Sequence, residues 1–101
     1  MIVLEKDVEQ YLKNQIHIHK GLCWKWVSPG TNGVPDRIVV CHQQVVFVEL
    51  KRPHGGKTSA LQKLRWQQLL NQGQMVQVIS TKQQVDELVT YLTSEQTDHA
   101  I

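Results

Sequence analysis

Residues 33–51 read GVPDRIVVCHQQVVFVELK and contain two short apolar segments, rich in β-branched residues, on either side of a polar turn. Such segments are typical of buried strands. We therefore expect strands over residues 36–41 and 45–50 that pair as a central hairpin. Asp36, Glu49 and Lys51 lie in or directly beside these strands, so the expected centre of the sheet also carries the first chemical feature of the chain.

The segments outside this hairpin alternate between helix and strand patterns. Ser59 with Gln62 and Thr81 with Gln84 form two capping-box patterns, each at the expected start of a helix. The order predicts an α/β fold with helices flanking a mixed central sheet. The expected elements are a helix with apolar residues Leu4, Val8, Leu12 and Ile16, strands over residues 22–27, 36–41 and 45–50, a helix ending near Gly73, a strand over residues 75–79, and a helix containing Val85, Leu88, Val89 and Leu92.

A chain of 101 residues is the size of one domain, so we expect residues 1–101 to form a single domain. Its core should span about residues 3–93, with a C-terminal tail over 94–101. No apolar stretch approaches the roughly 20 residues that a membrane helix needs. The N-terminal segment lacks the pattern of a secretory signal, so the expectation is a cytoplasmic protein that does not contact membranes.

Cysteine and histidine spacing argues against a zinc site. Cys23 and Cys41 form no C-x-x-C pair, and without an export signal they are expected to be reduced thiols. His17 and His19 are two residues apart, so on a helix they point in different directions. Trp24 and Trp26 alternate on the first expected strand, which favours packing in the core over stacking on bases.

The formal net charge is only +2, which by itself says little about a nucleic-acid partner. The distribution of the charge is more informative. A basic stretch without any acid directly follows the second strand of the hairpin, whereas acidic residues gather near the C-terminus. The basic residues are Lys51, Arg52, Lys57, Lys63 and Arg65, and His54 lies among them.

The charged residues of the hairpin predict a metal site. Glu49 and Lys51 are two apart on a strand and therefore project from the same face. Asp36 begins the partner strand, so a hairpin brings its carboxylate opposite Glu49. Two close carboxylates repel one another and require a cation. Oxygen ligands favour Mg²⁺, with Mn²⁺ as a substitute, and a neighbouring ammonium can orient or help to deprotonate an attacking water.

An isolated E-x-K triplet is most often a surface ion pair. Here it ends an apolar strand that follows a G-x-P-D turn and another apolar strand, an order that few purely structural patterns produce. Residues 33–37 (GVPDR) with residues 47–51 (FVELK) resemble the signature of PD-(D/E)xK nucleases, and more narrowly that of a stand-alone phage or bacterial virus-type replication-repair nuclease (VRR-NUC) domain. The likeness extends to residues 5–9, residues 28–30, Gln62 and the last strand and helix.

This resemblance implies a restriction-endonuclease-like fold of order αβββαβα, a need for Mg²⁺ or Mn²⁺, and hydrolysis of phosphodiester bonds in DNA. Small phage and bacterial members resemble Holliday junction resolvases and act as homodimers. By matching position, Asp36, Glu49 and the backbone carbonyl of Leu50 become metal ligands, and Lys51 becomes the catalytic lysine. The matching acid on the first helix, which ligates directly or through water, is Glu9, with Glu5 as the alternative.

Other matched positions have structural interpretations as well. Gln62 corresponds to a glutamine of the family site, although its capping box with Ser59 also explains it. Ser28 lies where related resolvases carry a serine near phosphate, and turn formation explains it nearly as well. The basic residues now form a hypothetical DNA-binding rim: Arg52, His54, Lys57, Lys63 and Arg65.

The leading hypothesis is a metal-dependent endodeoxyribonuclease that acts on branched DNA such as four-way junctions, as a homodimer in a phage- or prophage-carrying bacterial cell. The same residues fit cleavage of flaps, nicks, linear duplexes or RNA. A non-catalytic nucleic-acid-binding domain would keep the fold without the activity, and a purely structural domain would have no site-specific metal binding. The branched-DNA preference follows from the resemblance alone.

Overall fold

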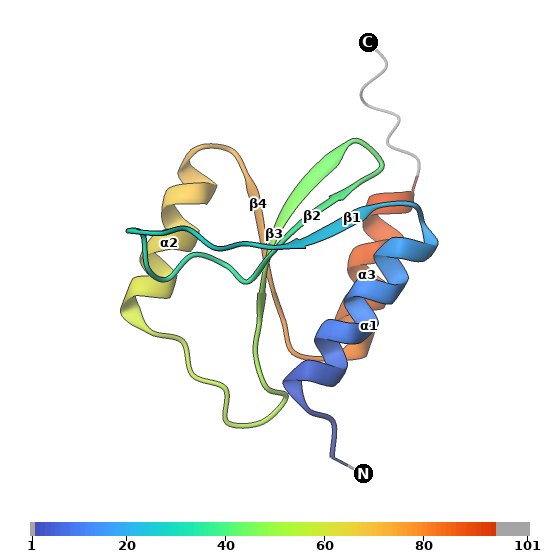
Figure 1. The fold of residues 1–101 in the computed structure, drawn as a ribbon, viewed down its shortest axis with the longest axis horizontal. Helices are drawn as coiled ribbons and strands as arrows, with labels where there is room; N and C mark the ends of the chain where they lie inside the picture. The colour runs from blue at the N-terminus through green and yellow to red at the C-terminus, as the bar shows by residue number, and fades with distance from the viewer. Residues whose placement is uncertain (1, 95–101) are drawn as a thin grey trace.

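The computed structural model describes residues 2–94, which form three helices and one four-stranded sheet (Figure 1). The predicted order of helices and strands is confirmed. Met1 and the expected tail from residue 95 onward lie outside the described residues. The elements are α1 (Glu5–Ile18), β1 (Leu22–Lys25), β2 (Arg37–Cys41), β3 (Gln44–Leu50), α2 (Ala60–Asn71), β4 (Met75–Ile79) and α3 (Lys82–Thr93).

The sheet is mixed, with the strand order β1-β2-β3-β4. β2 pairs with both β1 and β3 in the antiparallel direction, whereas β3 and β4 are parallel. The predicted hairpin of β2 and β3 closes through a two-residue turn, in which His42 and Gln43 have φ of 50° and 66°. Positive φ at both turn residues matches the twist of the paired strands and fixes their register.

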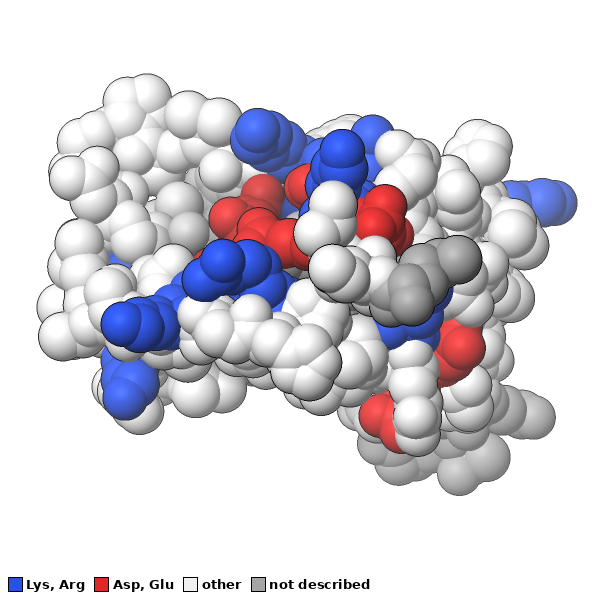
Figure 2. Space-filling view, turned by 90° about the horizontal axis from the view of Figure 1, so that it is seen from below, with Lys and Arg blue, Asp and Glu red and all other residues white. Residues whose placement is uncertain are grey.

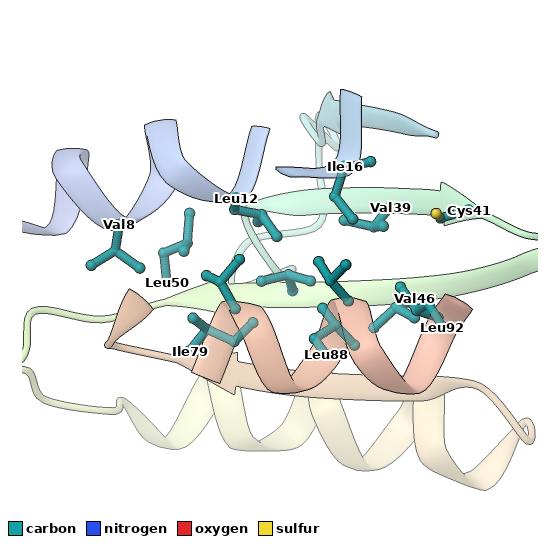
Figure 3. Packing of buried hydrophobic residues seen from close by; sticks show 13 residues of the cluster. Val8, Leu12, Ile16, Val39, Cys41, Val46, Leu50, Ile79, Leu88 and Leu92 are labelled. Atoms are coloured by element: carbon teal, nitrogen blue, oxygen red, sulfur yellow. The ribbon is translucent and has the colours of Figure 1, made fainter. Parts of the chain in front are cut away.

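The main core lies on one face of the sheet. In Figure 1, α1 and α3 cover this face and α2 lies on the other. Figure 3 shows Val8, Leu12 and Ile16 of α1 pointing toward Val39 and Leu50 of the sheet. The buried apolar residues of this layer are Val8, Leu12, Ile16, Val39, Cys41, Val46, Val48, Leu50, Ile79, Val85, Leu88, Val89 and Leu92.

The α2 face is covered much less completely. No residue of α2 is fully buried, because this helix lies beside β4 at one edge of the sheet. The expected core position of Trp24 is therefore wrong: its side chain is 60% exposed. Trp24 belongs to β1, the opposite edge, where no helix covers this face. Trp26 is half-buried and packs against Phe47, with ring centroids 5.2 Å apart.

Two further observations concern the ends of elements and the membrane. β1 ends at Lys25, two residues earlier than expected, and β2 begins at Arg37, so that Asp36 directly precedes the strand.

Within residues 2–94, no helix combines the length and the apolar character required to cross a bilayer.

Candidate nuclease site

Two carboxylates meet where β2 begins and β3 ends. Arg37 pairs with Val48 in the antiparallel register, so Asp36 and Glu49 lie opposite one another. The Asp36 carboxylate accepts a hydrogen bond of 2.8 Å from the backbone N–H of Leu50. This bond ties Asp36 to the end of β3, and the hairpin thereby holds both acids together as the sequence predicts.

The loop before Asp36 is held against α2. Gly33 has a φ of +86°, and a Cβ atom there would lie 2.8 Å from the Leu61 side chain, so both conformation and space favour glycine. Pro35 is fully buried. Arg65 of α2 donates a 2.7 Å hydrogen bond from Nε to the Asn32 carbonyl. These contacts make the approach to Asp36 rigid and give Arg65 a structural role.

Glu49 is the buried polar residue of the site, with only 2% of its surface exposed. Burial raises the pKa of its carboxyl, and the neighbouring charge of Asp36 adds to the rise, whereas Lys51 opposes it; the result is a pKa of about 7. Its Oε1 atom is buried and has no hydrogen-bond partner among the described residues. A buried oxygen of this kind is a natural ligand for a hard cation.

The Lys51 amine is held by three oxygen atoms. Its Nζ donates hydrogen bonds of 2.8 Å to the Gln62 side-chain oxygen and of 2.8 Å to the Lys57 carbonyl, and lies 3.6 Å from Oε2 of Glu49. The side chain is only 15% exposed. The expected common orientation of Glu49 and Lys51 is therefore observed, and the amine has a fixed position beside the carboxylates.

Gln62 connects the acid and the lysine. Its Nε2 donates to Oε2 of Glu49 at 3.1 Å, while its Oε1 accepts from Lys51. The same residue forms the capping box of α2: Oε1 also accepts from the Ser59 N–H, and its own N–H donates to the Ser59 hydroxyl. The capping interpretation and the site interpretation hold together, because the start of α2 lies at the site.

The segment between β3 and α2 folds back on the strand end. Arg52 donates a 2.8 Å hydrogen bond to the Gly55 carbonyl, which closes a tight turn. A Cβ atom on Gly56 would lie 3.1 Å from backbone atoms of Arg52 and 3.2 Å from Cβ of Lys51. This close approach brings the Lys57 carbonyl to the Lys51 amine.

The structure does not join the first-helix acids to this group. Glu9 forms an ion pair with Arg37, 2.8 Å between Oε2 and Nε, and Arg37 also donates to the Cys23 carbonyl at 3.3 Å. Glu5 is exposed. Within residues 2–94, no three carboxylate, histidine or cysteine side chains come together as a metal-binding cluster. Asp36 and Glu49 are a pair of acids rather than part of a larger set.

Lysine and arginine side chains lie on two sides of a group of acidic side chains on one face of the molecule (Figure 2). In Figure 2, acidic side chains gather near the middle of the face seen from below, with lysine and arginine side chains on either side. Arg52, Lys57 and Lys63 are exposed, whereas Arg65 is half-buried and engaged with Asn32. In the loop before the site, the backbone carbonyl of Ser28 accepts from the Thr31 N–H at 3.0 Å, which supports the turn interpretation of this serine.

Sequence reasoning missed two contributors to the site. Arg37 follows Asp36 directly, and its position on a strand predicted to face a helix was the signal for a buried ion pair with that helix. The second contributor, the Lys57 carbonyl, is a main-chain atom in an irregular segment, and no side-chain pattern identifies it.

A mixed sheet whose central hairpin carries Asp36, Glu49 and Lys51 at one end defines the PD-(D/E)xK class of nucleases. No protein-family model matches the chain. The chain is similar to "Putative nuclease p44" of Acyrthosiphon pisum secondary endosymbiont phage 1, with 33% identity over 82 residues that cover 80% of this chain and 87% of the relative. It is also similar to a solved "VRR_NUC domain", with a TM-score of 0.77, 26% identity, and coverage of 96% of this chain and 97% of the other. The chain belongs to the VRR-NUC family, and it is a nuclease.

Proposed function

We propose that this chain is a Mg²⁺-dependent endodeoxyribonuclease, with Mn²⁺ as a substitute, that cuts branched DNA. The observation that carries the proposal is the buried, unpartnered Oε1 of Glu49 beside Asp36, with the Lys51 amine 3.6 Å from the other Glu49 oxygen. Such a pair of acids is poorly stable without a cation, and nucleases of this class use divalent metals. The donor atoms fit a hard cation.

In this proposal, Asp36, Glu49 and the Leu50 carbonyl hold the cation, and Glu9 contributes only through water because its Oε2 already pairs with Arg37. When bound, the cation neutralises phosphate charge and makes water more acidic. Lys51 orients the attacking water and offsets the negative charge that develops on the phosphate. Gln62 keeps Lys51 and Glu49 in position through its two hydrogen bonds.

The exposed Arg52, Lys57 and Lys63 form the DNA-binding rim of the proposal, supported by their place directly after β3. Ser28 and Arg65 contribute by shaping the loop beside Asp36, and His54 lies within the rim segment. Each lysine or arginine that neutralises a phosphate adds about 0.9 to the salt dependence of duplex binding. A triple neutral variant of Arg52, Lys57 and Lys63 should therefore bind DNA with a clearly shallower salt slope, and an unchanged slope would rule the rim out.

Resolution of a symmetric four-way junction requires two cuts, and each chain supplies the one Asp36–Glu49 pair that its residues 2–94 form. We therefore include a two-fold homodimer in the proposal, since a two-fold axis presents two identical sites to a symmetric junction. Sedimentation of the protein with and without junction DNA measures this directly. A monomer on the junction that still makes paired cuts would contradict the dimer.

The decisive experiment incubates labelled four-way junction, flap and linear duplex DNA with the protein in Mg²⁺ or in EDTA. We expect metal-dependent cleavage, fastest on the junction, and a loss of at least about 100-fold in Lys51→Ala and Asp36→Asn. Lys20→Asn is the matched control, because Lys20 is exposed and lies beyond the opposite end of the β1–β2 pair from Asp36. If no substrate gave a metal-dependent product, the proposed endonuclease activity would be wrong, and a non-catalytic nucleic-acid-binding domain would be the remaining interpretation.

A further inference from the structure

The sheet face that carries α2 has a part that no helix covers. α2 lies beside β4, so the same face of β1 and β2 stays open (Figure 1). Residues that are directly opposite in the strand register point to the same side of a sheet and form cross-strand rows. The two rows on the open part of this face are Leu22–Val40–Val45 and Trp24–Ile38–Phe47, and we call them the open patch.

The side chains of the open patch are all apolar, and several remain in water. Trp24 is 60% exposed, Leu22 44% and Val45 42%, and these three belong to or flank the same pair of rows. Apolar surface left in water forgoes about 25 cal/mol for each Å² that burial would remove. Single exposed apolar residues are ordinary, but a contiguous group of them marks a contact surface.

The other face of the same sheet shows what the open patch lacks. Two helices, α1 and α3, cover that face, whereas α2 alone lies on this one (Figure 1). A sheet of four strands measures about 14 Å between its outer strands, and a helix with its side chains is about 10 Å across. One helix therefore leaves roughly half of such a face uncovered, and the open patch has room for a further layer.

The open patch carries no charge, which makes it unsuited to the phosphates of DNA. The charged residues of β1 and β2 point to the opposite face, where Lys25 pairs with Arg37 in the register and Arg37 reaches Glu9 of α1. The region beside the patch is uncharged as well, because residues 66–81 contain no acidic or basic residue and no histidine. Such a surface fits an uncharged, apolar surface of a protein.

We propose that the open patch is the surface through which two copies of this chain form the homodimer, with Trp24 as the main anchor. This inference rests on the proposed function, which includes two sites related by a two-fold axis. In a two-fold contact the same patch lies on both partners, so an uncharged apolar patch is its own complement. A buried tryptophan is a frequent source of binding energy in such contacts.

The second half of α2 supplies the border of this contact. A specific interface covers about 800 Å² on each partner, with an apolar centre and a polar border. Gln67, Gln68 and Asn71 of α2 are exposed and uncharged, and they extend the surface beyond the open patch. The dimer contact therefore consists of the open patch at its centre and these amide side chains at its border.

The test is sedimentation equilibrium of the full chain in EDTA without DNA. We expect a dimer for wild type and a dimer dissociation constant at least about 10-fold higher for Trp24→Asp and for Val45→Asp, because each places an unpaired charge in the contact. Trp24→Phe should retain most of the affinity. Ile2→Asp is the matched control, since Ile2 is 82% exposed but precedes α1, outside the open patch, and it should dimerise as wild type does.

Cooperative urea unfolding of each variant shows that it is folded, and the two aspartate variants lie on different strands. Folded Trp24→Asp should cut a flap as wild type does, because its Asp36 and Glu49 are unchanged, but should lose paired cuts in a four-way junction. Wild type that is monomeric at every concentration would overturn the inference, as would Trp24→Asp and Val45→Asp variants that dimerise like wild type. A dimer that depends on Trp24, in a protein that cleaves no DNA with Mg²⁺, would support the contact and refute the proposed catalysis.

Discussion

Glu49 shows at the scale of one residue why this site needs a cation. Its carboxylate is buried at the end of an apolar strand, next to a second acid, and one of its oxygens has no partner within residues 2–94. A merely structural domain would favour a neutral or apolar side chain there, because burying an acid beside a second acid costs free energy even when one of its oxygens is paired with a lysine. Glu49 therefore lowers the stability of the fold, and its proposed role as a metal ligand explains why an acid occupies this position.

The raised pKa of Glu49, about 7, predicts how metal-free stability depends on pH. Below about pH 4.5 the carboxyl is protonated in both the folded and the unfolded state, and stability is greatest with respect to this group. As pH rises from 4.5 through 7, the unfolded state loses its proton first, so the free energy of unfolding falls, by on the order of 3 kcal/mol in total. Urea titrations in EDTA at several pH values measure this fall.

Glu49→Gln is the control for that titration. The amide cannot ionise, so the variant should lose most of the decline between pH 4.5 and 7 and should be more stable than wild type at pH 8 in EDTA. Added Mg²⁺ at pH 8 should then stabilise wild type more than Glu49→Gln, because it binds the ionised carboxylate. A variant with the same pH profile as wild type would show that another group causes the decline.

The two roles of Gln62 are separable by mutation. Ser59→Ala removes the hydroxyl that caps α2 and should cost about 1 kcal/mol of stability while leaving the contacts of Gln62 with Lys51 and Glu49 in place. Gln62→Ala removes those contacts and should lower kcat by about 10- to 100-fold beyond the effect of Ser59→Ala. Chemical denaturation and single-turnover cleavage measure the two effects. Equal kcat values in both variants would show that Gln62 only caps α2 and does not position Lys51 and Glu49 for cleavage.

At the scale of elements, the site depends on how α1 is attached to β2. The Glu9–Arg37 ion pair joins the two, and Arg37 also reaches the Cys23 carbonyl of β1. Arg37 directly follows Asp36, so its position affects the first residue of the site. The Arg37 side chain is only 12% exposed, which makes its partner important for stability.

We predict that Glu9→Ala lowers the free energy of unfolding by about 1–3 kcal/mol, because it leaves a nearly buried guanidinium without its carboxylate. Glu9→Gln keeps an acceptor and should lose less. Mg²⁺ affinity, followed by calorimetry, should fall less in Glu9→Gln than in Asp36→Asn, since Glu9 is committed to Arg37. A larger loss of affinity in Glu9→Gln would make Glu9 a direct ligand.

At the scale of the whole molecule, local sequence patterns predicted the part of the fold that carries the acids. Two apolar segments rich in β-branched residues and the short polar turn between them were sufficient to bring Asp36 opposite Glu49, and the capping boxes predicted where α2 and α3 begin. The position of α2 over the sheet was not predictable in this way, because it depends on long-range packing. The exposure of Trp24 follows from that position.

The one-sided core makes a final prediction about stability. Leu12 is completely buried between α1 and the sheet, whereas Leu70 on α2 is 49% exposed. Leu12→Ala should therefore reduce the free energy of unfolding by about 2–5 kcal/mol, and Leu70→Ala by less than about 1 kcal/mol. Urea denaturation of dilute protein compares the two. If the cost of Leu70→Ala grows with protein concentration, the open face of α2 is buried by a second copy, and the homodimer forms through this side of the molecule.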